Sequence, residues 1–97
     1  MATYIVLGNF TDQGIRNVKD TTKRAEAFKE MARKAGVKVK EVYWTLGQYD
    51  LATIMEAPDE ETATALGLSA CSLGNIRTQT LRAFSAEEMG RIIAKMP

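Results

Sequence analysis

The order of strand-forming and helix-forming segments is the feature that most constrains the fold of this chain. Runs rich in β-branched and aromatic residues recur along it, and each run is ended by glycine, proline or polar residues. The predicted strands are Thr3–Phe10, Val37–Leu46, Tyr49–Ala57 and Ile76–Phe84. One helix-forming segment lies between the first and second strands, and another lies between the third and fourth. The sequence therefore predicts the order β-α-β-β-α-β.

Capping residues mark the ends of the first helix. Asp20 or Thr21 can cap this helix, which is predicted to run to Lys34 and to end at Gly36. Its apolar residues recur on one face, as expected for a helix that packs on a sheet. The preceding segment, Thr11–Asp20, is predicted to be a polar connection.

A second helix is predicted between Pro58 and Gly74. Asp59 can cap it, and the acidic residues of its first turn favour the helix dipole. Its buried side is a narrow stripe of mostly small residues, which suits close packing on a sheet: Ala63, Leu66, Gly67, Ala70, Leu73 and Gly74. Ser85 and Glu88 then form a capping box that opens a last helix. This helix carries an apolar side made of Met89, Ile92, Ile93 and Met96.

The predicted order of elements indicates an α+β protein with a ferredoxin-like fold. In this fold an antiparallel four-stranded sheet carries two helices on one face, and the present chain adds a C-terminal helix. A length of 97 residues fits one domain, spanning residues 1–97. Domains of this size bury a smaller fraction of their surface than larger domains do, so we expect the chain to pair with copies of itself as a homodimer or higher homo-oligomer.

The composition excludes several classes of function. The chain has no histidine, which rules out Ser-His-Asp and Cys-His catalytic sites and His-ligated haem or zinc. Cys71 is the only cysteine, so one subunit can form neither a disulfide nor a four-thiolate metal site. We therefore expect no metal and no cofactor. With 13 basic and 12 acidic residues, nothing in the net charge favours nucleic acid or an anionic membrane as partner.

The sequence also shows no sign of export or membrane insertion. No window approaches the ~20 apolar residues that a membrane-spanning helix needs. The N-terminus lacks the basic region, apolar core and cleavage site of a secretory signal. We expect a cytoplasmic protein.

A hairpin is predicted at Gly47-Gln48, because a two-residue type II′ turn prefers glycine first. Such a turn pairs residues that then share a sheet face, and the pairs expected on the core face are Leu46 with Tyr49, Trp44 with Leu51 and Val42 with Thr53. The pairs expected on the opposite face are Thr45 with Asp50, Tyr43 with Ala52, Glu41 with Ile54 and Val39 with Glu56. Polar groups among apolar residues indicate that a partner subunit or a ligand half-buries this second face. We predict self-association through Tyr43, Ala52, Ile54 and Val39.

The candidate ligand-binding residues are Tyr43, Tyr49, Asp50, Glu56 and Arg77, and each has a purely structural alternative. Asp50 either holds the backbone of the hairpin or binds a ligand. Glu56 either forms a contact between subunits or at the end of its strand, or is a buried carboxylate with a raised pKa. The two tyrosines suit either a bound carbonyl group or a protein interface. Arg77 either holds an anion or pairs with one of the two carboxylates.

Several segments of the chain resemble the GYD domain family. Gly47, Tyr49 and Asp50 stand in the G-x-Y-D arrangement for which that family is named. The likeness extends to nearly the whole chain through "YIVLGNFTDQGIRNVKD", "EAPDEETA" and "LGNIRTQTLRAF". The resemblance implies a ferredoxin-like subunit related to the dimeric α/β-barrel proteins, in which two sheets pack face to face. It implies no particular reaction, because relatives of this fold include cofactor-free oxygenases, haem enzymes and ligand-binding regulators.

Two classes of function stay open at this point. The residues favour a non-catalytic oligomeric module that binds a small molecule or merely assembles. The alternative is a small cofactor-free enzyme, monooxygenase-like or isomerase-like, of the dimeric α/β-barrel type. In that enzyme Asp50 or Glu56 would accept a proton, and a tyrosine or Arg77 would hold a substrate oxyanion. A deep pocket where Asp50 and Arg77 converge without pairing would favour the enzyme.

Overall fold

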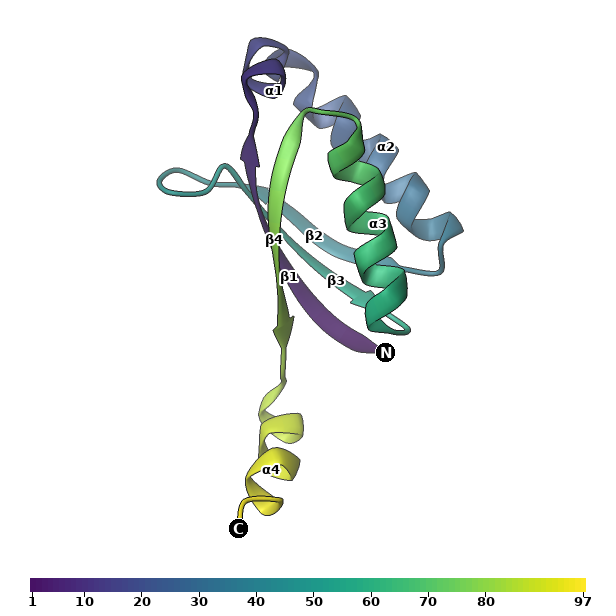
Figure 1. Ribbon diagram of the computed structural model, residues 1–97, viewed down its shortest axis with the longest axis vertical. Helices are drawn as coiled ribbons and strands as arrows, with labels where there is room; N and C mark the ends of the chain where they lie inside the picture. The colour runs from purple at the N-terminus through teal and green to yellow at the C-terminus, as the bar shows by residue number, and fades with distance from the viewer.

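The predicted strands form one antiparallel sheet in the computed structural model, which describes residues 1–97 (Figure 1). The strands are β1 (Ala2–Phe10), β2 (Lys38–Trp44), β3 (Leu51–Ala57) and β4 (Ile76–Ala83). Their order in the sheet is β2-β3-β1-β4, so β1 lies in the centre and pairs with β3 and β4. Each strand is antiparallel to its neighbours.

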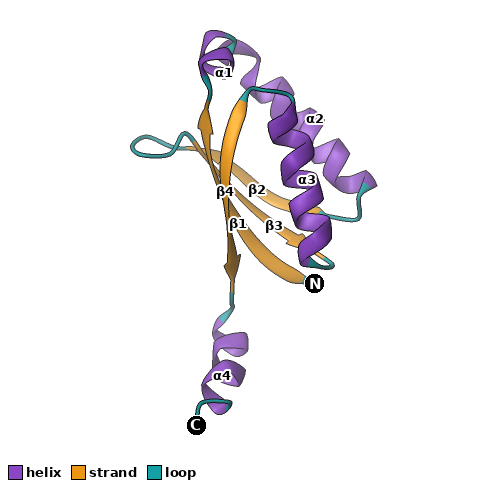
Figure 2. Ribbon diagram, in the orientation of Figure 1, coloured by secondary structure: helices purple, strands orange, loops and turns teal.

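Helices α2 (Thr21–Lys34) and α3 (Glu60–Ser72) cover one face of this sheet, and no helix covers the other (Figure 2). The arrangement is a ferredoxin-like fold, as predicted. Asp59 caps α3 by accepting a hydrogen bond of 2.7 Å from the Thr62 N–H, which holds the pKa of the Asp59 carboxyl below its ordinary value. Asp20 precedes α2 without making a side-chain cap.

The segment Thr11–Asp20 is more ordered than its polar composition predicts. It forms the short helix α1 (Asp12–Arg16) and the 3-10 turn η1 (Val18–Asp20). Thr11 caps α1 by accepting a hydrogen bond from the Gly14 N–H. The backbone at Gly14 packs so closely on Asn75 that a Cβ atom there would overlap the Asn75 carbonyl oxygen. A five-residue helix is too short to show apolar periodicity, which is why the sequence does not reveal it.

The hairpin between β2 and β3 has the predicted register from Glu41 to Trp44, and its turn is wider than predicted. Trp44 pairs with Leu51 as expected, but residues 45–50 form a loop in which Leu46 and Tyr49 do not pair. The Thr45 N–H donates to the Asp50 carbonyl at 2.8 Å, and the Thr45 hydroxyl donates to the Tyr49 carbonyl at 2.6 Å. The side-chain hydroxyl thus satisfies a carbonyl that a tight turn would have paired within the strands.

One predicted pair of this hairpin, Val39 with Glu56, is wrong because β2 contains a β-bulge. The register shifts between Val39 and Glu41, so that Val39 pairs with Met55 rather than with Glu56. Val39 therefore packs against the core between the sheet and the helices, and it does not belong to the face predicted for self-association. The extra residue of the bulge is Lys40, whose Nζ lies 3.4 Å from Glu56 Oε1.

The core lies between the sheet and the two helices and is small. Its members are Tyr4, Ala32, Val37, Met55, Ala57, Ala63 and Leu66. The Tyr4 hydroxyl is buried there without a hydrogen-bond partner. Most of the buried side chains are small, so the helices add little bulk over much of the sheet.

Helix α4 (Ala86–Ala94) projects away from the sheet beyond the end of β4 (Figure 1). The predicted capping box is present, and the Ser85 N–H and then Arg82 lower the pKa of Glu88. The apolar side of α4 is exposed on Met89, Ile92, Ile93 and Met96. The projecting helix contributes to an elongated molecule of 50 × 31 × 18 Å. None of the helices has the length and apolar character needed to cross a membrane.

Candidate functional site

The sheet face opposite α2 and α3, here called the outer face, is apolar at its centre. The pairing of the strands brings its residues together: Ile5 lies opposite Ile54 on one side and opposite Leu81 on the other. Leu7 and Tyr43 both lie opposite Ala52. Tyr43 and Leu81 are 51% and 39% exposed, and the chain places no second layer over them. The outer face thus has the composition of a surface that packs against another layer.

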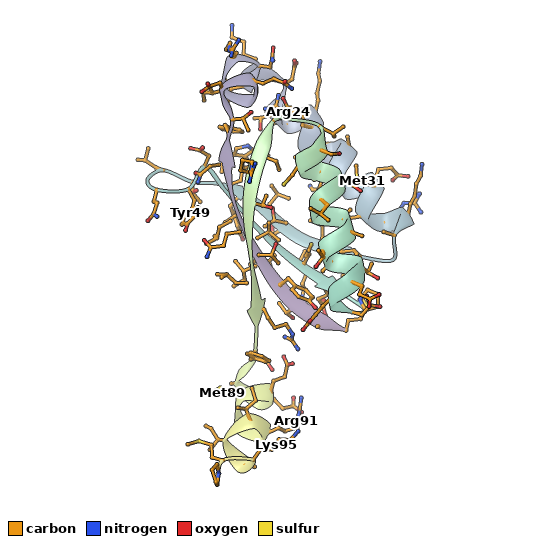
Figure 3. The ribbon with its side chains drawn as sticks, in the orientation of Figure 1. Arg24, Met31, Tyr49, Met89, Arg91 and Lys95 are labelled. Carbon is orange, nitrogen blue, oxygen red and sulfur yellow. The ribbon has the colours of Figure 1, made fainter.

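Four of the five candidate residues lie on or beside the outer face. The Tyr49 hydroxyl donates to Gln79 Oε1 at 3.0 Å, which places its ring beside β4. Figure 3 shows Tyr49 near the hairpin loop, away from α2 and α3. Arg77 lies two residues from Gln79 on β4, is exposed, and forms no salt bridge. Tyr43 lies on β2 and Glu56 on β3, on the other side of β1 from β4.

Asp50 is held by the backbone rather than by another side chain. Its carboxylate accepts a hydrogen bond of 2.9 Å from the Phe10 N–H, and its own N–H donates to the Gly8 carbonyl at 2.8 Å. These bonds fasten the base of the hairpin to the end of β1. The Asp50 carboxylate therefore makes a structural contact, but the backbone that it holds belongs to β1 and not to the hairpin as predicted.

The two predicted carboxylates do not form one site with Arg77. Glu56 pairs with Lys40, and Asp50 binds the Phe10 N–H, so the predicted pairing of Arg77 with either carboxylate is absent. Asp50 precedes the first residue of β3, whereas Glu56 is near its last residue. An acid-base pair acting on one substrate must converge on it, and these residues are spread along the strand instead. Their role as ligand-binding residues stays a prediction.

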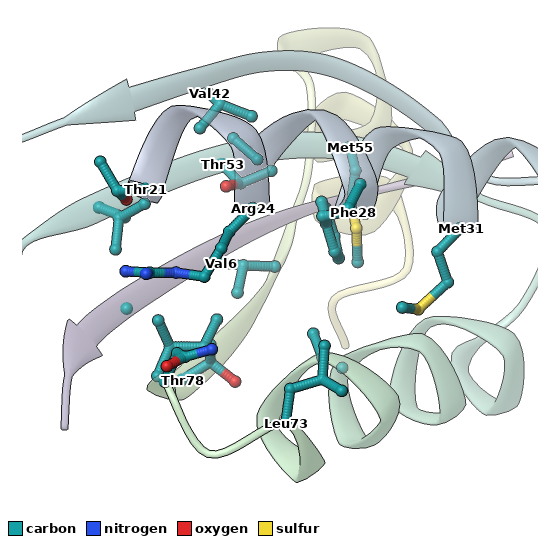
Figure 4. Close-up of a pocket in the computed structure, with 18 of the residues that line it drawn as sticks. Val6, Thr21, Arg24, Phe28, Met31, Val42, Thr53, Met55, Leu73 and Thr78 are labelled. Carbon is teal, nitrogen blue, oxygen red and sulfur yellow. The ribbon is translucent and has the colours of Figure 1, made fainter. Parts of the chain in front are cut away.

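A cavity of about 360 Å³ lies on the other side of the sheet, beneath α2 and α3 (Figure 4). Its walls are mainly apolar and include Phe28, Met31 and Met55. Arg24 of α2 is the only charged residue among those that line it. The Arg24 guanidinium donates to the carbonyls of Asn17 at 2.7 Å and Gly14 at 3.2 Å.

The small-residue stripe of α3 predicts close packing on the sheet, but part of it borders the cavity instead. The small-residue stripe of α3 is buried at Ala63, Leu66 and Ala70, as predicted. At Gly67, however, the stripe does not pack closely on the sheet, because a Cβ atom there would have no atom within 4 Å. Gly67 and Ala70 instead border the cavity. A cavity is indicated where small residues of a helix lie opposite small residues of the sheet, as Gly67 and Ala70 do here with Gly8 and Thr53.

Comparison with known proteins identifies a family and a fold. The family model described as "GYD domain" matches residues 4–93. A protein of Thermus thermophilus, named "Glutamine synthetase and cystathionine beta-lyase binding protein", is 36% identical over 90 residues, which is 92% of this chain and 95% of that protein. A crystal structure of a Thermus thermophilus protein superposes with a TM-score of 0.64 at 30% identity, and the match covers 89% of this chain and 96% of that one.

Proposed function

This chain belongs to the GYD domain family, and we propose that it acts as a non-catalytic module that associates with itself and binds another protein. The observation that carries this proposal is the uncovered apolar centre of the outer face, made of Ile5, Leu7, Ile54 and Leu81. Complete burial of one such side chain stabilises by roughly 1.5–3 kcal/mol, so several half-buried ones favour a second layer.

A second copy of the chain suits this surface. Two sheets pack face to face at about 10 Å, and a twofold axis allows the same patch to serve both subunits. In such a pair Ile54 and Leu81 of one copy would lie against the apolar centre of the other. The resulting assembly would be of the dimeric α/β-barrel type.

Helix α4 supports self-association independently of the sheet. An isolated helix of nine residues is marginally stable in water. The salt bridge that joins α4 to the sheet is between Glu88 Oε2 and Arg82 Nη2, which lie 3.3 Å apart. The apolar side of α4, with Ile92 and Ile93, faces no residue of the core. In the proposed assembly this side packs on another copy.

A protein partner is proposed from the name of the Thermus thermophilus relative, which describes a protein that binds two enzymes. The rim of the outer face carries Tyr49 and Arg77, and tyrosine and arginine are enriched where proteins meet. In this proposal the candidate residues at the rim contact a partner protein or a small ligand at the edge of the assembly.

Self-association is tested with Ile54→Asp. A charge buried without a partner is costly, so this variant should sediment as a monomer at micromolar concentration while the wild type sediments as a dimer or larger species. Thr64→Asp is the matched control, because it adds the same charge to an exposed position on α3. A second variant, Leu81→Asp, repeats the test on another strand, and circular dichroism checks that each variant folds. A wild type that sediments as a monomer would contradict the proposal.

Protein binding is tested by co-elution of the chain with glutamine synthetase or cystathionine beta-lyase from its own organism. The proposal expects a complex with the wild type and a weaker one after Tyr49→Ala combined with Arg77→Ala. The control is Lys23→Ala, which removes an exposed side chain from α2. Failure of both enzymes to bind would remove the partner part of the proposal and leave the self-association part to the sedimentation test.

A further inference from the structure

We propose that the cavity beneath α2 and α3 binds a small monocarboxylic acid with an apolar body. This inference goes beyond the proposed function, because the cavity lies on the opposite side of the sheet from the outer face. It depends on three features of the cavity: the small residues that keep it open, its apolar walls, and its single charge.

The cavity is kept open by small residues in both layers. On the helix side, Gly67 leaves free space where a side chain would stand. On the sheet side, Gly8 of β1 and Thr53 of β3 border the cavity. Protein interiors are normally packed as densely as organic crystals, so an apolar space of this size needs an occupant to recover the lost contacts.

The volume and the walls define the body of that occupant. About 360 Å³ is at the lower end of the range for small-molecule pockets, which begins near 300 Å³. At roughly 30 Å³ for a water-sized group, this volume holds roughly a dozen non-hydrogen atoms. Phe28, Met31 and Met55 line it, and methionine side chains adapt to ligands of different shape. The body is therefore a short alkyl chain or a small aromatic group.

Arg24 defines the head group. It is the only charged residue that lines the cavity, and it forms no salt bridge with any carboxylate of the chain. Its two hydrogen bonds to the Gly14 and Asn17 carbonyls fix the guanidinium and leave some of its five N–H donors free. A guanidinium with free donors binds a carboxylate well, because the two groups match in geometry and charge.

The polar and apolar parts of the cavity lie at different ends. Figure 4 shows Arg24 and Thr21 toward one end and Met31 toward the other. Thr78 lies near the Arg24 end and can donate its hydroxyl hydrogen to the second carboxylate oxygen, since that hydroxyl contacts only the Cys71 sulfur at 3.3 Å. A monocarboxylate can then lie with its head at Arg24 and its body between Phe28 and Met31.

Titration calorimetry with decanoate tests the proposal, and decan-1-ol is the uncharged comparison. Decanoate has roughly the dozen non-hydrogen atoms that the volume allows. The wild type should bind one decanoate per chain, about tenfold more tightly than decan-1-ol, because a hydrogen-bonded charge adds at least that factor. A dissociation constant above about 1 mM for decanoate would overturn the proposal.

Two variants locate the binding. Gly67→Leu fills the cavity and should abolish decanoate binding, whereas Thr64→Leu places the same side chain on the exposed side of α3 and should leave it unchanged. Arg24→Gln should bring decanoate down to the affinity of decan-1-ol, about a tenfold loss. Lys23→Gln is its control, because it removes the same charge from an exposed neighbouring position.

Each contrary outcome overturns a stated part of the inference. Decanoate binding that survives Gly67→Leu would mean that the acid binds elsewhere, for example at the outer face. An unchanged preference for decanoate after Arg24→Gln would mean that Arg24 does not hold the head group. Thermal unfolding followed by circular dichroism shows that each variant is folded before it is titrated.

Discussion

The two faces of the sheet differ in the size of their central side chains and in whether helices cover them. On three strands a large aliphatic residue faces outward and its neighbour along the chain, a smaller residue, faces the helices. These neighbours are Leu7 and Gly8 on β1, Ile54 and Thr53 on β3, and Leu81 and Thr80 on β4. At these three pairs the smaller residue lies under the helices and leaves space for the cavity, whereas Tyr4 and Met55 fill the covered face farther along β1 and β3.

The helices of the chain therefore leave two apolar regions without packing partners, the outer face of the sheet and the cavity on its inner face. A domain gains most of its stability from apolar surface removed from water, and here much of the best apolar surface faces outward. The outer face needs a second layer, which we propose is another copy. The inner face needs an occupant for its cavity, which we propose is a small acid. Substitutions on each face distinguish contacts with a second copy from packing beneath the helices.

The largest effect is expected from truncating adjacent residues on β3 that point to opposite faces. Met55 is 1% exposed on the inner face, so Met55→Ala should lower the free energy of unfolding by about 2–5 kcal/mol at any protein concentration. Ile54→Ala on the outer face should lower it by an amount that depends on protein concentration, because it weakens contacts between copies. Urea unfolding at two protein concentrations measures both effects. Equal concentration dependence for the two variants would contradict the distinction between the faces.

The next largest effect is expected at Asp50, at the base of the hairpin. Asp50→Ala leaves the part-buried Phe10 N–H without its acceptor, which should cost about 1–3 kcal/mol. Asp50→Asn should cost less, because the amide oxygen can still accept that hydrogen bond. Thermal unfolding of both variants gives the comparison. If Asp50→Asn matches wild-type stability but abolishes ligand or partner binding, Asp50 serves a site.

A double-mutant cycle between Asp50→Asn and Arg77→Gln sharpens the same question. Their side chains form no salt bridge, so the coupling free energy of stability should be near zero. The cycle is measured by urea unfolding of the two single variants and the double variant. A coupling above about 0.5 kcal/mol would show an ion pair of the kind that the sequence suggested.

A smaller effect of opposite sign is expected at Tyr4 on the inner face. Its hydroxyl is buried without a partner, so Tyr4→Phe removes an unsatisfied group and should raise the free energy of unfolding by roughly 1 kcal/mol. The control is Tyr43→Phe, whose hydroxyl lies on the exposed outer face. Calorimetric melting temperatures measure the difference. A lower melting temperature for Tyr4→Phe would show that the hydroxyl has a partner in solution.

A still smaller stabilising effect than at Tyr4 is expected from Gly67→Ala at the wall of the cavity. The added methyl group meets no atom within 4 Å, so helix propensity alone should raise the free energy of unfolding by roughly 0.5–1 kcal/mol. Gly90→Ala on α4 is the control, since a Cβ atom there also meets nothing. Urea unfolding measures both variants. A loss of stability at Gly67 would mean that the cavity has less free space than the structure shows.

Local signals in the sequence determined most of the elements. The turn residues and the period-two alternation predicted the strands, and Asp59 and Ser85 marked the starts of α3 and α4 because capping depends on only a few neighbouring residues. The register of the hairpin also followed from the sequence, since Trp44 pairs with Leu51 as predicted. The outer face followed from that register, apart from Val39, which lies on the inner face, and Tyr49, which was predicted on the core face and lies beside the outer one.

Three features depend on contacts between segments distant in the chain and become visible only in the folded structure: the side of the sheet on which Val39 lies, the partner of Asp50, and the cavity. Because of the bulge at Lys40, Val39 lies on the inner face. The Asp50 carboxylate, a predicted partner of Arg77, instead accepts a hydrogen bond from the Phe10 N–H. The cavity arose because Gly67 of α3 and Thr53 of β3 both border the space between the two layers. A single strand or helix shows its own apolar periodicity, but the space between two elements depends on how their side chains meet, and only the folded chain brings them together.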